Sequence, residues 1–239
     1  MNRIKSIIFL FFAVLASQVA LRANAEEIIL NPDTKNMAWV YGQVGKNTIE
    51  HFYEGVNAFY VRSLNDRINV MGGLELNSKK DGFGGVLAEL SYKLPVRWFD
   101  LVFSGRGVYN RYGKYDCNEY LFRLAVNAQS SHFDVLFGNS FLGYSQFGSS
   151  VFEPITWSVG FAAYLKNRKK CNWNVGLFLK NYDYFIYENW NINFGVRGYF
   201  SLTPKVRLTG ELLVRPAGNI NQLAQKFDTS VKIGATYRW

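Results

Sequence analysis

The last stretch of the chain, residues 227–239, decides the fold and reads FDTSVKIGATYRW. Its odd-numbered positions, from Phe227 to Trp239, are apolar or aromatic apart from one threonine, and its even-numbered positions are polar, charged or glycine. Alternation with a period of two residues is typical of a β-strand whose two faces have different surroundings. The stretch therefore predicts a strand with one apolar face that ends on an aromatic residue.

The same alternation recurs along the chain and predicts twelve strands. It is clear around residue 194, where Ile192, Phe194 and Val196 alternate with asparagine, glycine and arginine. In the first two strands two apolar faces compete, Trp39 against Val40 for example, so their orientation stays open. The predicted strands cover residues 36–45, 53–63, 67–78, 83–94, 98–111, 119–129, 132–144, 154–165, 172–183, 190–201, 205–215 and 227–239.

The links between these strands alternate in length. Short links at 64–66, 94–97, 130–131, 167–171 and 202–204 alternate with longer ones at 112–118, 146–153 and 216–226. The link at 79–82 is an exception, because it is as short as a turn. Outer-membrane barrels show this rhythm, with short turns on the periplasmic side, where both termini lie, and longer loops outside.

A soluble β-sandwich also has strands with one apolar and one polar face, so alternation alone does not choose between the two folds. Polar side chains on one face of nearly every strand favour a membrane barrel. So do the six tryptophans, which fall near predicted strand ends, where aromatic girdles lie at the two interfaces; they are Trp39, Trp98, Trp157, Trp173, Trp190 and Trp239. The sequence predicts an all-β fold, a transmembrane antiparallel up-and-down β-barrel of twelve strands over residues 36–239.

The final strand, which ends Tyr237-Arg238-Trp239, resembles the last strand of bacterial outer-membrane β-barrels. That resemblance implies insertion into the outer membrane with the help of periplasmic chaperones and the barrel-assembly machinery, and contact with outer-membrane lipids and lipopolysaccharide. In length and in its basic polar face the chain is similar to the small twelve-stranded porins for acidic sugars and oligosaccharides. This similarity implies a narrow channel.

The start of the chain predicts a cleaved signal peptide over residues 1–25. Arg3 and Lys5 precede an apolar run, and Ala23-Asn24-Ala25 forms a small-residue cleavage site. An uncleaved anchor is the alternative, although Ser17 and Gln18 interrupt an apolar run that is already short. We expect residues 26–35 to form a short N-terminal periplasmic segment and the chain to be exported to the bacterial outer membrane.

Composition gives the expected mature protein a mild basic excess. Without the three basic residues of 1–25, 24 basic and 18 acidic residues remain, a net charge of +6. Such an excess could favour anionic solutes or lipopolysaccharide phosphates, or could be ordinary surface charge. The basic residues are scattered singly at alternate positions, so no nucleic-acid partner is expected.

Charged residues on the polar face are the candidate lumen-lining residues: Arg106, Arg123, Arg197, Arg207, Lys180, Lys232, Glu75, Glu89 and Glu211. If the barrel is open, this basic lining lowers the barrier for small anionic solutes. The alternative is an Arg–Glu network that fills the interior of a structural or adhesin-type barrel. Apolar residues predicted on the same face, such as Leu87 and Leu121, agree with partial filling.

An outer-membrane lipid-modifying enzyme is a third alternative, and such enzymes usually need His beside Ser or Asp. The chain has two histidines: His51, which follows Glu50 in the first predicted external loop, and His132, which follows Ser131 in a predicted periplasmic turn. A single histidine in a loop is more often solvated than catalytic, so we expect no enzymatic activity. No spacing of His and Cys suggests a metal site and no motif suggests a cofactor, so none is expected.

The two cysteines are predicted at opposite ends of the barrel. Cys117 lies in a predicted external loop and Cys171 in a predicted periplasmic turn. An apolar wall of about 25 Å separates these ends, whereas a disulfide needs Cα atoms within about 7 Å. Two free thiols are therefore expected.

Overall fold

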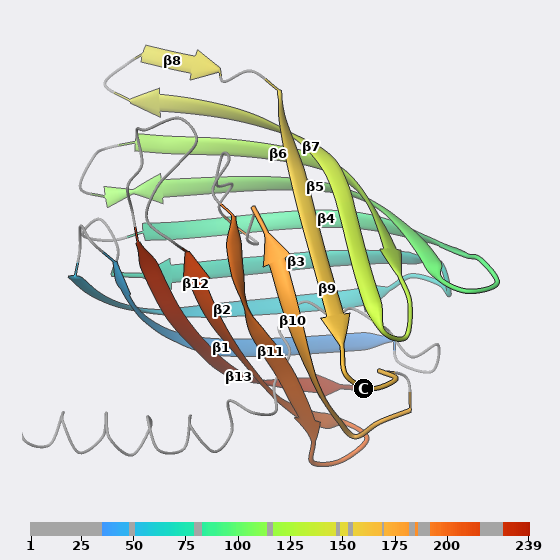
Figure 1. Cartoon of the computed structure of the whole chain (residues 1–239). Coiled ribbons are helices and arrows are strands. Elements are labelled where there is room, and N and C mark those ends of the chain that lie inside the picture. Colours follow the sequence, from blue (N-terminus) through green and yellow to red (C-terminus); the bar gives the residue numbers. More distant parts are fainter. Residues whose placement is uncertain are drawn as a thin grey trace, which may run out of the picture.

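The structure is a computed structural model that describes residues 35–47, 51–78, 83–113, 117–146, 149–152, 155–168, 170–181, 185, 192–215 and 227–239. This part of the chain forms one antiparallel sheet of thirteen strands (Figure 1). The strands are β1 (Asn36–Asn47), β2 (His51–Ser63), β3 (Ile68–Asn77), β4 (Phe83–Pro95), β5 (Asp100–Tyr112), β6 (Cys117–Gln129), β7 (Phe133–Gln146), β8 (Ser149–Phe152), β9 (Thr156–Tyr164), β10 (Trp173–Lys180), β11 (Asn193–Ser201), β12 (Val206–Arg215) and β13 (Asp228–Arg238). Over the same ranges, no helix has the length and apolarity needed to cross a membrane.

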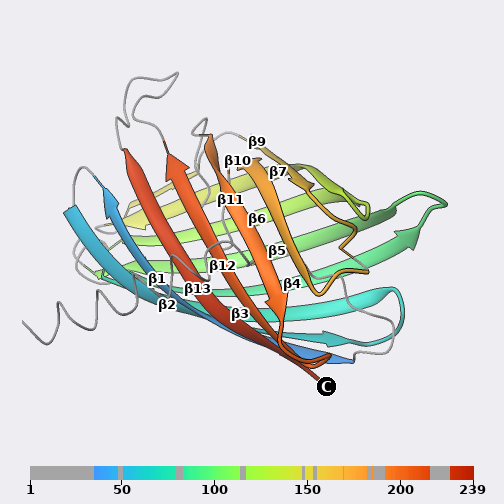
Figure 2. The same cartoon turned by 60° about the horizontal axis from the view of Figure 1, so that its bottom comes forward.

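The sheet closes on itself because the first strand pairs with the last. β1 and β13 are in register from Met37↔Arg238 to Asn47↔Asp228. β7 pairs with β6 on one side and with β9 on the other, whereas β8 pairs only with the last residues of β7. The closed ring therefore holds twelve strands, and Figure 2 shows them from another side. β8 lies beyond the ring as a short hairpin partner of the end of β7 (Figure 1). The predicted twelve-stranded antiparallel barrel is confirmed.

One predicted link is wrong. Residues 146–153 were expected to form an external loop, but β7 continues to Gln146 and β8 adds four residues that pair back onto it. The added pairs include Ser145↔Ser150 and Gln146↔Ser149. The sequence from Ser145 to Phe152 does not alternate apolar and polar residues as the other strands do, so alternation gave no sign of this hairpin.

Burial alternates along the strands, and it shows which residues of β1 and β2 face the interior. Trp39 and Phe59 are 3% and 4% exposed, whereas Val40 and Tyr60, one position further along, are 50% and 42% exposed. The two buried rings stack with centroids 4.9 Å apart inside the barrel. Large aromatic rings fill this part of the interior and leave the smaller Val40 on the outer face.

Trp39 therefore corrects the expectation that every tryptophan lies in an aromatic girdle. Its ring is inside, where it stacks on Phe59, and stacked aromatic pairs add to the stability that burial provides. Four other tryptophans, at 98, 157, 173 and 239, are exposed, and Trp190 lies outside the described residues.

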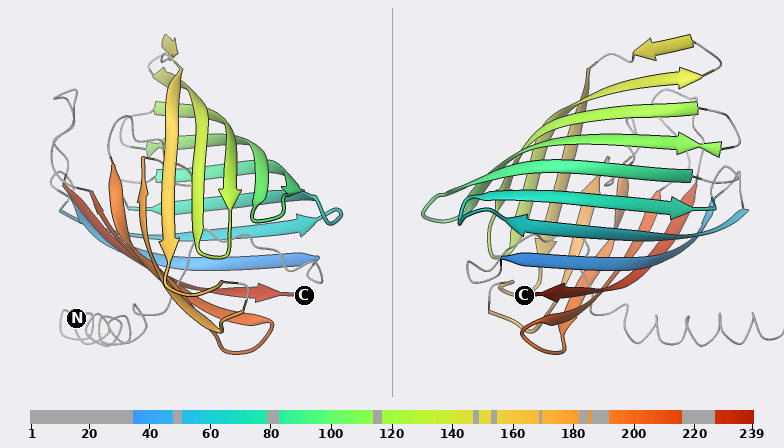
Figure 3. Two further views of the ribbon diagram at one scale, coloured as in Figure 1. Left: turned by 45° about the vertical axis from the view of Figure 1, so that its right-hand side comes forward. Right: turned by 180° about the vertical axis from the view of Figure 1, so that it is seen from behind.

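Both ends of the barrel chain meet at one end of the molecule, which we call the terminal end. The backbone N–H of Asn36 donates to the carbonyl of Trp239, and that of Trp239 donates back to Asn36, both at 3.0 Å. The links at 64–67, 96–99, 130–132, 165–172 and 202–205 lie at this end (Figure 3). The opposite ends of the strands form the other end of the barrel, which we call the loop end.

Candidate functional site in the barrel interior

Strand alternation brings most of the predicted lumen-lining residues to the buried face. Eight of the nine are at most 8% exposed: Glu75, Glu89, Arg106, Arg123, Lys180, Arg197, Glu211 and Lys232. Arg207, near the terminal end, is half-buried, and its guanidinium lies 4.0 Å from the centre of the Tyr199 ring. Removing this many charges from bulk water is costly unless each one is paired or hydrogen-bonded, so their partners determine what the interior can do.

A first cluster lies on β10 to β13. Arg197, Glu211 and Lys232 are direct register partners on three adjacent strands. Glu211 lies 3.6 Å from Lys180 Nζ and 3.9 Å from Arg197 Nε. Three cations around one carboxylate give this cluster a net charge of +2.

The aromatic ring of Phe178 on β10 contacts two cations of the same cluster. Its ring lies 4.4 Å from the Arg197 guanidinium carbon and 5.0 Å from Lys180 Nζ. The negative face of an aromatic ring attracts cations, and this attraction is stronger away from water. The ring therefore helps to hold cations in the interior without cancelling their charge.

A second cluster lies on β4 to β6. Glu89, Arg106 and Arg123 are register partners on adjacent strands, so the two arginines lie side by side. Arg106 Nε donates to Glu89 Oε2 at 2.7 Å, and its Nη2 lies 2.6 Å from the same oxygen. Two cations and one carboxylate give this cluster a net charge of +1.

The two clusters occupy opposite walls. In the closed ring, β5 and β12 are six strands apart in either direction. The interior therefore has one cationic cluster on each side. Glu211 contacts Lys180 and Arg197 in the first cluster, and Glu89 contacts Arg106 in the second.

An apolar region fills the interior beside the second cluster. It contains Met37, Trp39, Tyr41, Phe59, Val61, Met71, Leu87, Val108, Tyr112, Leu121, Leu142 and Phe185. All but the last lie on β1 to β7. The side chains of this region narrow the interior. Partial filling was predicted from apolar residues such as Leu87 and Leu121, which lie on the same face of their strands as the charged residues.

Phe185 reaches this region from the link between β10 and β11. It is fully buried, and its ring centroid lies 5.7 Å from that of Phe59 on β2. Its carbonyl accepts a hydrogen bond of 2.7 Å from Asn110 Nδ2 on β5, and Asn110 also donates to Glu119. A residue of a loop-end link thus lies inside the barrel and contacts strands on the far side of the ring.

Arg168 anchors the opposite, terminal end. Its guanidinium donates to both oxygens of Asp134, at 2.7 and 2.6 Å, and also to the carbonyl of Ser130. The Tyr199 hydroxyl donates to the carbonyl of Arg168 at 3.0 Å. These bonds fold the β9–β10 link inward and tie it to the β6–β7 link.

Sequence reasoning missed both Phe185 and Arg168. Phe185 lies in an aromatic stretch, YDYFIY, and an apolar residue in a polar link is a signal that could have indicated an inward contact. Arg168 lies in NRKK, which looks like an ordinary solvated basic turn. No local pattern distinguishes its guanidinium from those of its neighbours.

Several buried polar atoms in the interior have no hydrogen-bond partner among the described residues. Asn57 is 1% exposed and neither amide atom is bonded, and the hydroxyl of Thr209, also 1% exposed, is unpaired as well. Buried polar atoms are almost always satisfied by protein or by ordered water. These positions are suited to binding water or a polar solute.

The two histidines belong to opposite ends of the barrel. His132 is exposed in the β6–β7 link, where its Nδ1 lies 2.9 Å from Ser131 Oγ. His51 is not in a loop as expected, since it is the first residue of β2 and pairs with Asn47. Across the described residues, no group of three or more His, Cys, Asp or Glu could hold a metal ion.

Comparison with known proteins finds no matching family model and no matching curated protein. Solved structures with a similar fold include the KdgM porin in complex with disordered oligogalacturonate, at 9% identity and a TM-score of 0.55 over 84% of this chain and 99% of that one. The NanC porin matches at 10% identity and 0.53, over 84% and 100%. The translocator domain of the autotransporter NalP from Neisseria meningitidis matches at 12% identity and 0.53, over 100% and 98%. The chain has the fold of bacterial outer-membrane β-barrels.

Proposed function

We propose that this protein is an outer-membrane β-barrel that conducts small solutes through its interior and prefers anions. The observation that carries the proposal is the pair of cation-rich clusters on opposite walls, with net charges of +2 and +1. The shared fold supports it, since porins are among the similar structures.

The clusters would act on a solute through their electric field. Charge lining a passage with low-dielectric walls raises the local concentration of the opposite ion. Glu211 lies beside Lys180 and Arg197, and Glu89 is paired with Arg106, so these three cations need little reorganisation when an anion passes. Added salt should weaken the preference, because screening shortens the range of the field to about 10 Å at 0.1 M.

The solute class follows from the same chemistry. Carboxylate groups match guanidinium groups in shape and charge, and Asn57 and Thr209 offer unpaired hydrogen-bonding atoms to hydroxyl groups. A short acidic oligosaccharide presents both kinds of group. A sugar of this class, like the one in the KdgM complex, is our candidate solute.

Reversal potentials in planar bilayers test the anion preference. In a KCl gradient the wild-type channel should favour chloride, and the double substitution Arg123→Glu with Lys232→Glu should move the reversal potential towards potassium. Arg62→Glu, which changes an exposed side chain of β2, is the matched control and should leave the potential unchanged. A wild-type channel that prefers potassium would refute the proposal.

A filled barrel is the second candidate, and Phe185 is the observation that favours it. The ring and the apolar region around it occupy the interior beside the second cluster. In that case wild-type protein would conduct no current in bilayers, and the charged clusters would make the barrel rigid. Neither candidate assigns a catalytic role to His51 or His132.

A further inference from the structure

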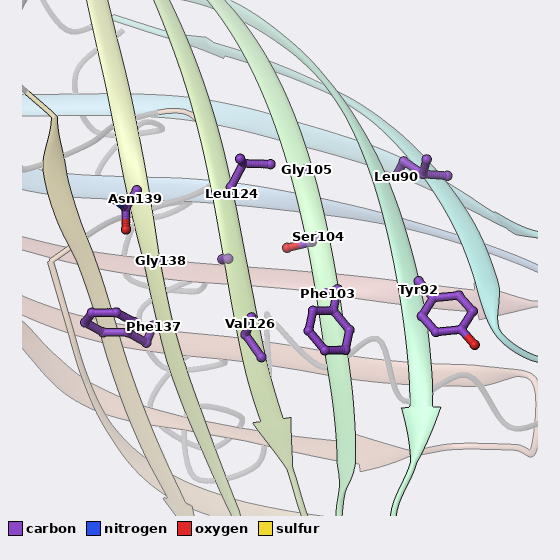
Figure 4. A pocket seen from close by; sticks show the side chains of 11 residues that line it. Leu90, Tyr92, Phe103, Ser104, Gly105, Leu124, Val126, Phe137, Gly138 and Asn139 are labelled. Atoms are coloured by element: carbon purple, nitrogen blue, oxygen red, sulfur yellow. The ribbon is translucent and has the colours of Figure 1, made fainter.

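The outer wall of the barrel has a groove across β4 to β7. It has a volume of about 480 Å³ and is lined by Leu90, Tyr92, Phe103, Ser104, Gly105, Leu124, Ala125, Val126, Phe137, Gly138 and Asn139. Figure 4 shows Tyr92, Phe103, Val126 and Phe137 in one row on four adjacent strands. The large apolar members, such as Phe103 and Leu124, are 41% and 50% exposed, so the groove faces away from the interior.

The groove exists because β5 has a glycine where its neighbours have large side chains. Gly105 pairs with Leu90 on one side and Leu124 on the other. A Cβ added at Gly105 would meet Leu124 Cδ2 at 3.5 Å, an ordinary contact, and nothing closer. Packing within the chain does not require the glycine, and the space above it is open to a molecule outside the barrel.

The groove lies close to the terminal end. Tyr92 is three residues from the end of β4, and Phe103 is three residues from the start of β5. At a rise of about 3.3 Å per residue, the row in Figure 4 is roughly 10 Å along the strands from that end. Because strands of such barrels tilt by about 35–45°, this distance corresponds to a depth of roughly 7–8 Å in a membrane, at the first part of an acyl chain below its headgroup.

Basic side chains lie at the same end. Arg67 in the β2–β3 link is exposed and its Nη1 donates to the Tyr92 hydroxyl at 3.3 Å, so a cation borders the groove. Arg97 in the β4–β5 link is exposed as well. Among described residues at the terminal end, six basic side chains are exposed (Lys35, Arg62, Arg67, Arg97, Lys170 and Lys205) against one acidic side chain, Asp66.

We infer that the groove binds one anionic glycerophospholipid of the periplasmic leaflet. An acyl chain lies over Gly105 between Leu90 and Leu124, and the phosphate is held at Arg67. Apolar walls suit the chain, and the excess of exposed cations suits an anionic headgroup. The inference rests on the proposed membrane location but not on conduction.

Lipid retention measured by native mass spectrometry tests this site. The full-length protein is refolded and equilibrated with equal amounts of phosphatidylglycerol and phosphatidylcholine of the same acyl chains. Wild-type protein should retain one phosphatidylglycerol. Arg67→Gln should lower its preference over phosphatidylcholine about fivefold, the worth of one cation near an anionic lipid phosphate. Lys205→Gln, at the same end but on another link, should leave the preference unchanged.

Filling the groove should remove the bound lipid. Gly105→Leu occupies the space directly, and Leu90→Trp fills it from β4 should the glycine variant fold poorly. Gly42→Leu is the matched control, because Gly42 also lies on the outer face, and a Cβ there would meet nothing closer than the Ile233 carbonyl oxygen at 3.9 Å. Retention by both groove variants equal to that of wild type would overturn the inference.

Two other results would also overturn it. Equal retention of the two lipids by wild-type protein would remove the headgroup preference. A dimer that Gly105→Leu disrupts would identify a second copy of the chain as the occupant. Bilayer recordings distinguish the two proposals. A barrel that conducts no current but still retains phosphatidylglycerol would refute the proposed channel and support the lipid site.

Discussion

Adjacent residues of one strand in this barrel have opposite surroundings. Leu177 on β10 is 64% exposed on the outer face, and Phe178, next to it, is 3% exposed beneath the Arg197 guanidinium. In a membrane the first side chain faces hydrocarbon and the second faces the interior. A charge introduced at Leu177 would therefore face hydrocarbon, whereas a charge introduced at Phe178 would face the interior of the barrel.

Leu177→Arg should lower the free energy of unfolding by about 2–4 kcal/mol if the position lies near the bilayer midplane. Leu177→Met, which keeps the side chain apolar and similar in volume, should cost less than about 1.5 kcal/mol. Urea unfolding of protein folded into lipid vesicles measures both. Equal costs for the two substitutions would contradict the face assignment.

The outer face was predictable from sequence because it is uniform. Val159, Phe161, Phe194 and Leu212 lie on the apolar face of strands that alternate clearly in sequence, and each is more than 40% exposed. The interior was less predictable, since it holds aromatic, apolar and charged residues together. Trp39 shows the limit, because nothing in β1 alone reveals that Phe59 on β2 will stack against it.

At the scale of elements, the β10–β11 link contributes the least predictable part of the interior. Alternation defines β10 and β11 but carries no information about the inward position of Phe185 in the link between them. The Phe185 contacts are made with Phe59 and Asn110, which are 126 and 75 residues away in the chain. Only the closed ring brings these positions together.

Phe185→Ala should raise the single-channel conductance, or make a silent barrel conduct. The substitution removes a fully buried ring from the apolar region that narrows the interior. Phe194→Ala is the control, because this ring is 47% exposed on the outer wall of β11 and its loss leaves the interior unchanged. A conductance that is the same in Phe185→Ala as in wild type would show that the ring does not limit the passage.

At the scale of the whole molecule, stability depends on the contact between the two ends of the chain. β1 and β13 hold each other in register over eleven residue pairs, from Met37↔Arg238 to Asn47↔Asp228. An open sheet would expose unpaired N–H and C=O groups, and each such group costs several kcal/mol in lipid. The terminal strand whose alternation predicts the fold is thus the strand that completes it.

Engineered cysteines test this closure. Val40 and Ala235 are register partners on the outer face, and directly paired residues of antiparallel strands have Cα atoms about 4.5–5.5 Å apart, within reach of a disulfide. In a background with Cys117 and Cys171 replaced by serine, Val40→Cys with Ala235→Cys should form a bridge on mild oxidation. Non-reducing gels of trypsin-cleaved protein would detect it.

The matched control moves one cysteine by two residues along β13. Val40→Cys with Tyr237→Cys keeps both side chains on the outer face, but diagonal neighbours lie about 7–8 Å apart, beyond the usual range for a disulfide. Bridging only in the control pair would show that β13 is displaced by two residues relative to β1. If neither pair formed a bridge, the barrel would be open between β1 and β13. The closed ring on which the charged passage and the outer groove depend would then be wrong.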